Sequence, residues 1–448
     1  MYSRPRPSTM DLVGLLDRFF HLTERSTDVR TDFNGALLIF LSMSYIIVVN
    51  PLMMSSAGMD PSATFTATVL MSIIGCLVMG LYANFPVAQA PAMGINAFFV
   101  YTVVLTMGYQ WDTALAAVVI SGALFLLVSI SGIRKRVLDS IPEGLRHGIT
   151  AGIGCFIALV GLMNAGIISG GSGTLVSLGD LSDAGVLLGL FSIGLTVFLY
   201  ARGLHGAILY GMLASALIGI VIGTTEVPES LFAVPSMPDI GAFLGGFGPE
   251  ILDMRFLMVV VSFAFVEFFD SSGTLMAVGK RAGITDGNGN VVCDRAVNAD
   301  AACASISGMV GCTPTSAFAE SAVGIEAGSR TGLTAVFVAM FFAVSLLIGP
   351  VFQMVDFRCT AGAMFIVGAA MITELRGMDW DDVPLTIAVM LTIMMMLLTY
   401  SITNGIAFGI IAYCVAMVGA RRRSELNSAM YAMAIISVLY YVMTVMYI

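Results

Sequence analysis

The chain has 448 residues, of which 58% are hydrophobic and only 11% are charged. A soluble domain of this length needs more charged surface, so the composition excludes an ordinary soluble protein and indicates a bilayer as solvent. The formal net charge of −9 gives no support for nucleic-acid binding. Apolar runs of about 20 residues suit membrane-spanning helices and are too long for barrel strands. We therefore expect an all-α polytopic membrane protein.

Residues 1–32 precede the first long apolar run and are rich in Arg. We interpret them as a cytoplasmic N-terminal arm, because they lack the apolar core of a signal peptide. Five apolar residues of the arm share one helical face: Leu12, Leu15, Leu16, Phe19 and Phe20. They predict a short helix on the inner membrane surface, with a solvated arm as the alternative.

Apolar segments then follow one another along the whole chain. We expect spans near residues 33–54, 63–82, 86–108, 112–131, 148–169, 184–201, 205–223, 256–278, 298–312, 314–328, 331–354, 360–375, 383–401 and 404–420. Of the 20 Lys and Arg residues, 18 fall in the arm or in every second gap between spans. Because cytoplasmic loops are enriched in Lys and Arg, this pattern predicts about fourteen crossings with the N-terminus inside.

The last apolar run, residues 430–448, does not fit that count. It follows the triple Arg at 421–423. Three interpretations stay open: a further span, a surface helix, or an earlier helix divided wrongly.

Two segments are interrupted, one in each half of the chain. The third span carries Pro86 and Pro91 before Asn96, and the tenth begins at Pro314 and carries Glu320. A Pro favours extended chain before it and a helical first turn after it, so each segment predicts an extended stretch that meets a half-helix. Half-helix N-termini offer unpaired N–H groups to a central cavity. The alternative is two Pro-kinked packing helices.

A weak internal repeat relates the two halves. Residues 113–120 resemble residues 331–338, and both stretches follow an interrupted segment. An odd number of spans per half would place the halves in opposite orientations in the membrane. Inverted repeats of this kind are typical of secondary transporters.

Three carboxylates lie inside apolar spans: Glu267, Asp270 and Glu320. A charge in this position costs several kcal/mol by a rough estimate, so such residues usually serve a substrate, an ion or a proton. Glu267 and Asp270 are three residues apart and share one helical face. Two acids so placed should not both be ionised in a dry site, which suits proton coupling. Alternatively, Asp270 anchors half-helix N–H groups or the hydroxyls of Ser271 and Thr274.

Other residue types add less. Four Phe residues near these segments could stack on a planar ligand, although a Phe in a span more often packs: Phe98, Phe99, Phe268 and Phe318. The seven Cys residues form no CxxC pair, so we expect apolar packing, with no disulfide and no metal site. The three His lie at loop or surface positions, and no nucleophile–base cluster appears. We expect neither an enzyme nor a bound cofactor.

Seven segments in order along nearly the whole chain carry a resemblance to a known family: residues 23–30, 45–51, 90–99, 265–274, 320–322, 330–336 and 400–409. The chain resembles the adenine–guanine–hypoxanthine permeases of the nucleobase–cation symporter group. The resemblance implies two inverted seven-span repeats. It implies a core domain of residues 33–131 and 256–354 that moves against a gate domain of residues 148–223 and 360–420. Residues 421–448 remain a basic loop and an extra apolar segment.

By position, the family's substrate and proton residues fall on Glu267, Asp270, Glu320 and Asn96. The resemblance implies that Glu267, Glu320 and Asn96 bind substrate beside Phe98 and Phe318, and that Glu267 and Asp270 couple the proton. Glu267 stands where this subgroup usually has Asp, so the preference among purines is open.

We therefore expect a plasma-membrane importer of guanine, hypoxanthine and/or adenine, driven by proton symport as the core rocks against the gate. The alternatives are a xanthine or uracil transporter of the same fold and an anion transporter of related architecture. An anion site should have cations rather than Glu267 and Glu320 beside the half-helices. The expected partners are a purine base and membrane lipid, with no nucleic acid, and a homodimer is left open.

Overall fold

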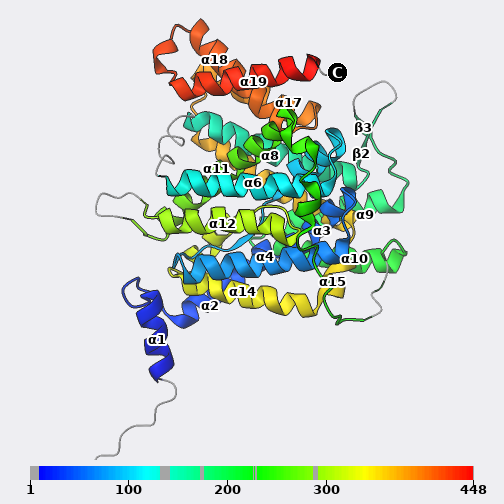
Figure 1. The fold of residues 1–448 in the computed structure, drawn as a ribbon. Helices are drawn as coiled ribbons and strands as arrows, with labels where there is room; N and C mark the ends of the chain where they lie inside the picture. The colour runs from blue at the N-terminus through cyan, green and yellow to red at the C-terminus, as the bar shows by residue number, and fades with distance from the viewer. Residues whose placement is uncertain are drawn as a thin grey trace, which may run out of the picture.

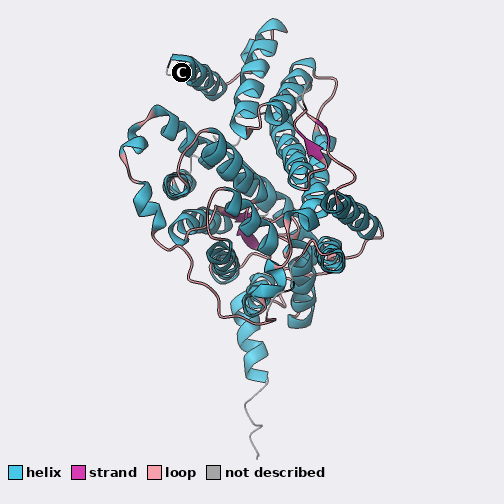
Figure 2. Ribbon diagram, turned by 90° about the vertical axis from the view of Figure 1, so that its right-hand side faces the viewer, coloured by secondary structure: helices cyan, strands magenta, loops and turns pink. Residues whose placement is uncertain are grey.

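The computed structural model describes residues 10–131, 142–171, 176–225, 227, 230–285 and 291–446. Most helices run nearly parallel to one another through a single bundle (Figure 1). Figure 2 shows many of them end-on, with a pair of short strands lying among them. Among the residues that the structure describes, eight helices are long and apolar enough to cross a membrane. The predicted all-α membrane architecture is confirmed, and the count of about fourteen crossings stays a prediction.

The α-helices of the first half are α1 (Met10–Phe20), α2 (Val29–Met43), α3 (Ile46–Ser56), α4 (Pro61–Leu81), α5 (Met93–Ala97), α6 (Trp111–Ile130), α8 (Glu143–Asn164), α9 (Ala184–Ala201) and α10 (Ala207–Ile222). Those of the second half are α11 (Met254–Arg281), α12 (Asp294–Val310), α13 (Ser321–Glu326), α14 (Gly332–Leu347), α15 (Gly349–Gln353), α16 (Phe357–Ile372), α17 (Val383–Leu398), α18 (Ile402–Gly419) and α19 (Ser428–Met446). The π-helix is η1 (Phe98–Thr106), and the 3₁₀ helices are η2 (Ala242–Gly246), η3 (Pro249–Leu252), η4 (Thr373–Gly377) and η5 (Arg423–Glu425). The strands are β1 (Gln89–Pro91), β2 (Ile168–Ser169), β3 (Ser177–Leu178) and β4 (Thr315–Ala317).

Both interrupted spans have the predicted form of an extended stretch followed by a half-helix. Strand β1 pairs antiparallel with β4, and Ala90 lies opposite Ser316 in the register. The N–H of Ala92 donates to the carbonyl of Pro314 (3.0 Å), which extends the pairing beyond the strands. Helix α5 follows β1 and continues into η1, whereas α13 follows β4. Each half of the chain thus contributes one broken span, and the two broken spans cross where β1 pairs with β4.

The first predicted span, 33–54, lies within one candidate membrane span, Val29–Ser56, which a turn divides into helices α2 and α3. Helix α2 ends at Met43 and α3 begins at Ile46. The turn between them places Tyr45 in the interior, where it is 1% exposed. The eleventh predicted span, 331–354, is likewise divided between α14 and α15. The turn in the first span matters for the site, because it delivers a polar side chain to the crossing.

The helices fall into two groups by their packing. In one group α12 packs along α6, α14 packs along α4 and α2, and α11 lies beside α6. In the other, α8 packs along α16 and α17, α9 lies between α16 and α10, and α17 packs along α18. Gly144, Gly148 and Gly152 bring α8 close to the side chains of α17, as small residues four apart do between membrane helices. The groups meet where α5 contacts α8 and η1 contacts α18.

The N-terminal arm is tied to one end of the first group. The Arg25 guanidinium donates to the carbonyls of Asn84 (2.8 Å) and Arg330 (3.2 Å). Helix α1 runs across the direction of the bundle helices at that end (Figure 1). Its residues Leu15 and Phe19 are 63% and 50% exposed. A helix on the membrane surface stays the prediction for this segment.

The final apolar run forms α19, which packs antiparallel along α18. Near one end the Cys414 thiol donates to the carbonyl of Met430 (3.8 Å). Near the other end the rings of Phe408 and Tyr441 have centroids 4.8 Å apart. In Figure 1, α19 runs in the direction of the bundle, and the C-terminus lies at the end opposite α1. This placement favours a further crossing over a surface helix.

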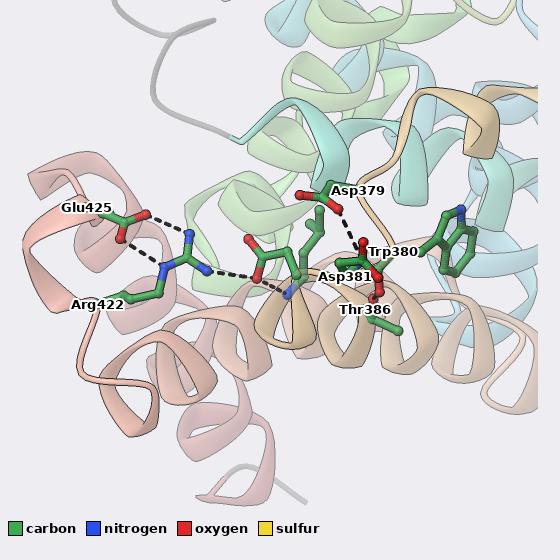
Figure 3. Close-up of polar contacts among 8 residues, drawn as sticks. Asp379, Trp380, Asp381, Thr386, Arg422 and Glu425 are labelled. Atoms are coloured by element: carbon green, nitrogen blue, oxygen red, sulfur yellow. Dashed lines mark hydrogen bonds and ion pairs between the residues drawn. The ribbon is translucent and has the colours of Figure 1, made fainter.

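Arg422 fixes the turn between α18 and α19. Its guanidinium donates to both carboxylate oxygens of Glu425 (2.9 and 2.7 Å), as Figure 3 shows. It also donates to Asp382, the residue that caps α17 (2.9 Å). A two-pronged Arg–carboxylate pair holds a defined geometry. The start of α19 is therefore held beside the start of α17.

We predict that reporters on the two ends of the chain lie on opposite sides of the membrane. A cytoplasm-active reporter fused before α1 should be active, and the same reporter fused after α19 should be inactive, because α19 returns the chain across the bilayer. A periplasm-active or surface-active reporter should give the reverse pattern. Activity of the same reporter at both ends would contradict the crossing and make α19 a surface helix.

Candidate functional site

Four carboxylates rather than three gather at the crossing of β1 and β4. Glu267 and Asp270 come from α11, Asp300 comes from α12, and Glu320 is the residue before α13. Glu267 and Asp300 are fully buried, whereas Asp270 and Glu320 remain partly exposed. Asp270 lies close enough to the other three to interact with each electrostatically. The structure therefore brings the predicted acids together and adds one.

A chain of polar groups joins Asp300 to Asp270. Asp300 accepts a hydrogen bond from the Gln89 amide (2.7 Å) and another from the Ser271 hydroxyl. The Ser271 Oγ lies 3.0 Å from the Ser316 Oγ, and the Ser316 hydroxyl donates to Asp270 Oδ2 (3.1 Å). Because Gln89 lies on β1 and Ser316 on β4, both broken spans take part in the chain.

Gln89 reaches Asp300 because its neighbour on α4 is a glycine. A Cβ at Gly75 would lie 2.7 Å from the Gln89 Oε1, too close for any real side chain. The backbone of Gln89 is held as well: its N–H donates to the Cys76 sulfur (3.2 Å), and the Cys76 thiol donates to its carbonyl (3.4 Å). The approach of α4 to β1 thus positions the amide toward the acid.

The alternative in which Asp270 binds the Ser271 hydroxyl is wrong. Ser271 donates to Asp300, and the bond to Asp270 comes from Ser316. Consecutive residues on a helix point about 100° apart, so the residue after an acid faces a different neighbour. The sequence also missed Asp300, which lies only two residues inside the predicted start of the ninth span at 298. Since α12 begins at Asp294, Asp300 lies nearly two turns inside the helix.

Glu320 has a partner from the break between α2 and α3. The Tyr45 hydroxyl donates to Glu320 Oε1 at 2.8 Å. A carboxylate that accepts from a phenol is held in one orientation, because its acceptor directions are fixed in the plane of the group. Sequence reasoning did not assign Tyr45 to the site, and its place at the start of segment 45–51, one of those that carry the family resemblance, is the signal that the sequence offered.

Glu267 and Asn96 are different, because they are buried without partners. Among the residues that the structure describes, neither carboxylate oxygen of Glu267 nor either polar amide atom of Asn96 forms a hydrogen bond. Asn96 lies on α5, and Phe98 just after it packs edge to face on Phe263 of α11 (ring centroids 4.7 Å apart). Phe263 precedes Glu267 by one helical turn. Unpaired buried polar groups are rare and costly, so these two are available to a ligand.

The aromatic residues near the site have separate surroundings. Phe98 is 1% exposed and packs on Phe263. Phe268 packs edge to face on Phe125 (5.5 Å). Phe318 lies at the end of β4, and its backbone N–H donates to the carbonyl of Ala88 (3.0 Å). Phe318 is therefore fixed beside the crossing by its main chain, with its ring free of the aromatic pairs found for the other two.

The fold and this site define a class of protein. Two broken spans that cross at the centre of a membrane bundle, with acids and unpaired polar groups at the crossing, are the arrangement of a secondary transporter. The chain belongs to the Permease family (Xan_ur_permease), which matches residues 32–408. The prediction of a transporter rather than an enzyme is confirmed by this membership.

Relatives match over almost the full length. The chain is 38% identical over 433 residues to the adenine permease AdeQ of Escherichia coli (strain K12), covering 95% of this chain and 97% of that protein. It is 37% identical over 436 residues to the guanine/hypoxanthine permease PbuG of Bacillus subtilis (strain 168), covering 95% and 99%. The transmembrane domain of the cyanobacterial bicarbonate transporter BicA shares the fold, with a TM-score of 0.64 at 15% sequence identity, covering 85% of this chain and 97% of that domain.

We predict that Asp300→Asn destabilises the protein. An amide offers one acceptor oxygen where the carboxylate receives two donors, so one buried group loses its partner at a cost of roughly 1–3 kcal/mol. The apparent melting temperature of purified protein in detergent should fall. The control is Glu326→Gln, the same chemical change in an exposed ion pair with Arg281 (3.3 Å), which should change little. Equal melting temperatures for the two variants would contradict a structural role for the chain of polar groups.

Proposed function

We propose that the protein imports purine nucleobases, namely guanine, hypoxanthine and/or adenine, by proton symport. One observation carries the proposal: Glu267 and Asn96 are buried at the crossing with all their polar side-chain atoms unpaired. Ring N–H groups and exocyclic amines give a purine several donors in one plane. A protonated carboxyl group can accept one of them and donate its own proton to a ring nitrogen, and an amide can add one acceptor and one donor.

The relatives support the substrate class. AdeQ and PbuG are permeases of adenine and of guanine and hypoxanthine, and both match this chain over nearly its whole length. The two substrates differ between relatives of similar identity, so the preference of this chain among purines has to be measured.

We further propose that Glu320 binds the base and that Phe318 stacks on it, with Phe98 lining the same site. Tyr45 holds the Glu320 carboxylate in place through its hydroxyl (2.8 Å). Glu320 remains partly exposed, which leaves it accessible to a ligand. Stacking on Phe318 would add affinity for a flat heterocycle, whichever purine it is.

Proton coupling is assigned to Glu267 with Asp270. Several acids in a water-poor site cannot all be ionised, because each negative charge disfavours the others. Glu267 has no donor to stabilise its charge, whereas Asp270 receives one from Ser316. A proton on Glu267 therefore relieves the larger electrostatic cost, and its release accompanies substrate release.

The two helix groups supply the moving parts in this proposal. The group that holds the acids acts as the core, and the group around α8, α16 and α17 acts as the gate. The core rocks against the gate in the plasma membrane, with the N-terminus in the cytoplasm. The base and membrane lipid are the partners, and chemical cross-linking in membranes measures whether the chain also forms a homodimer.

An anion transporter is the weaker alternative, although BicA shares the fold. Among the ion pairs in the described part of the chain, none joins Lys or Arg to Glu267, Asp270, Asp300 or Glu320. A site with four acids and no cation repels an anion. A competition assay distinguishes a xanthine or uracil transporter of the same fold from a purine transporter. Xanthine and uracil should compete poorly with guanine, hypoxanthine and adenine for uptake.

Uptake of radiolabelled bases into proteoliposomes tests the function. An imposed gradient, acidic on the side of entry, should concentrate at least one purine base above its external level. Collapse of the gradient with a protonophore should reduce uptake to equilibration. Uptake that ignores the gradient would contradict symport, and the absence of any purine uptake would contradict the substrate class.

We predict that Glu320→Gln weakens purine binding. The change replaces one acceptor by a donor and leaves mispaired buried groups, at a cost of roughly 1–3 kcal/mol. Calorimetry should show affinity lower by at least about tenfold, since roughly 1.4 kcal/mol corresponds to a factor of ten. The exposed Glu326→Gln, six residues later, should bind like the unmodified protein. Unchanged binding by a folded Glu320→Gln protein would exclude this role.

We predict that Glu267→Gln loses proton-driven accumulation, because a neutral amide cannot exchange the coupling proton. Proteoliposomes with an imposed pH gradient measure this, and Asp270→Asn is the companion variant. If Glu267→Gln still concentrates purine while Asp270→Asn does not, the coupling proton belongs to Asp270 and the assignment fails.

A further inference from the structure

Three aromatic rings from both helix groups meet beside the crossing. Tyr101 lies on η1 in the first group, Phe156 lies on α8, and Tyr400 lies between α17 and α18 in the second group. The Tyr400 ring packs edge to face on Tyr101 (centroids 5.5 Å apart, 88°) and on Phe156 (5.1 Å, 70°). Tyr101 and Phe156 also face each other at 6.4 Å. The contact therefore joins the two groups rather than stabilising either one alone.

A hydrogen bond from α8 to η1 spans the same junction. The side-chain amide of Asn164, the last residue of α8, donates to the Tyr101 hydroxyl (2.9 Å). Tyr101 is 6% exposed and Phe156 is fully buried. A buried hydrogen bond between two bodies adds orientation to the apolar contact and is lost when the bodies separate.

The backbone at Tyr400 is held in an unfavourable conformation. Its φ is +53°, in the left-handed region that bulky residues seldom adopt. Such a conformation persists only where the surroundings determine it, and here the ring is clamped between Tyr101 and Phe156. Separation of the two groups would remove the Tyr101 side of that clamp, because Phe156 lies in the same group as Tyr400. We therefore expect the backbone between α17 and α18 to change conformation at Tyr400 when the two helix groups separate.

The junction lies beyond the site along the direction of span 3. Tyr101 follows Asn96 by about one turn of the continuous α5–η1 helix. One turn before Phe156, Ile153 meets α5 so closely that a Cβ at Gly94 would lie 2.6 Å from its Cγ2. The rings cover this contact from the outer side in the proposed orientation.

We infer that Tyr101, Phe156, Asn164 and Tyr400 form the outer barrier of the transport path, closed in this structure and opened when the two helix groups separate. The inference rests on the proposed function as a transporter with two moving parts. It does not depend on the substrate, because the barrier is defined by contacts between the groups.

Cysteine labelling from outside tests the barrier. Ile153→Cys is placed in a chain whose seven cysteines are replaced by Ala, and intact cells or oriented proteoliposomes are treated with a membrane-impermeant maleimide. Labelling should be slow behind the closed barrier. Tyr101→Phe and Asn164→Leu should each accelerate it by about fivefold, the population shift expected for one lost hydrogen bond. The double variant should label no faster than Tyr101→Phe alone, because Asn164→Leu removes no further bond to Tyr101 once its hydroxyl is absent.

Two controls separate the possible failures. Tyr413→Phe removes a buried phenol from α18 away from the junction, and labelling of Ile153→Cys should not change. Ser182→Cys on the exposed loop before α9 should be labelled from outside at one rate in every background.

Unchanged Ile153→Cys labelling in both barrier variants, with normal Ser182→Cys labelling, would overturn the inference, even if the variants melt at lower temperature. Labelling of Ser182→Cys only from inside would overturn the outer assignment. Faster labelling without purine transport would support the barrier and refute the substrate.

Discussion

The pairing of β1 with β4 is the interaction on which the rest of the site depends. Extended chain at membrane depth exposes backbone N–H and C=O groups where no water is present to satisfy them. Each broken span solves this for the other, since Ala92 donates to Pro314 and Phe318 donates to Ala88. The two breaks are therefore not independent, and the side chains that follow them are delivered to one place.

The polar side chains at the crossing divide into two kinds. Asp300, Asp270 and Glu320 have donors from Gln89, Ser271, Ser316 and Tyr45, which offset part of the cost of their burial. Glu267 and Asn96 have none among the residues that the structure describes. The supported acids fix the geometry of the crossing, and the unsupported pair retains a cost that a bound molecule or proton can remove. Such a division of labour is expected where a site must release its ligand as readily as it binds it.

Local sequence features predicted the broken spans and most of the acids of this site, and missed the hydrogen bonds between its residues. Pro91 and Pro314 predicted the broken spans, because Pro acts on the chain next to it. Three of the four acids were visible as charges among apolar residues. Tyr45 was missed because its partner Glu320 is 275 positions away, and no local pattern encodes such a pairing. Asp300 was missed because α12 is rich in Ala and Ser and starts before the hydropathy rises. The last helix, α19, was undecided for a related reason: its direction is set by contacts with α18 rather than by its own composition.

The central claim is that Glu267 and Asn96 are left unpaired in order to bind the base. An experimental structure of the protein with a bound purine tests it most directly. We expect the ring N–H groups of the base within hydrogen-bond distance of the Glu267 carboxylate, and the Asn96 amide bonded to the same base. A purine bound elsewhere, with Glu267 and Asn96 still buried and unpaired, would contradict the account.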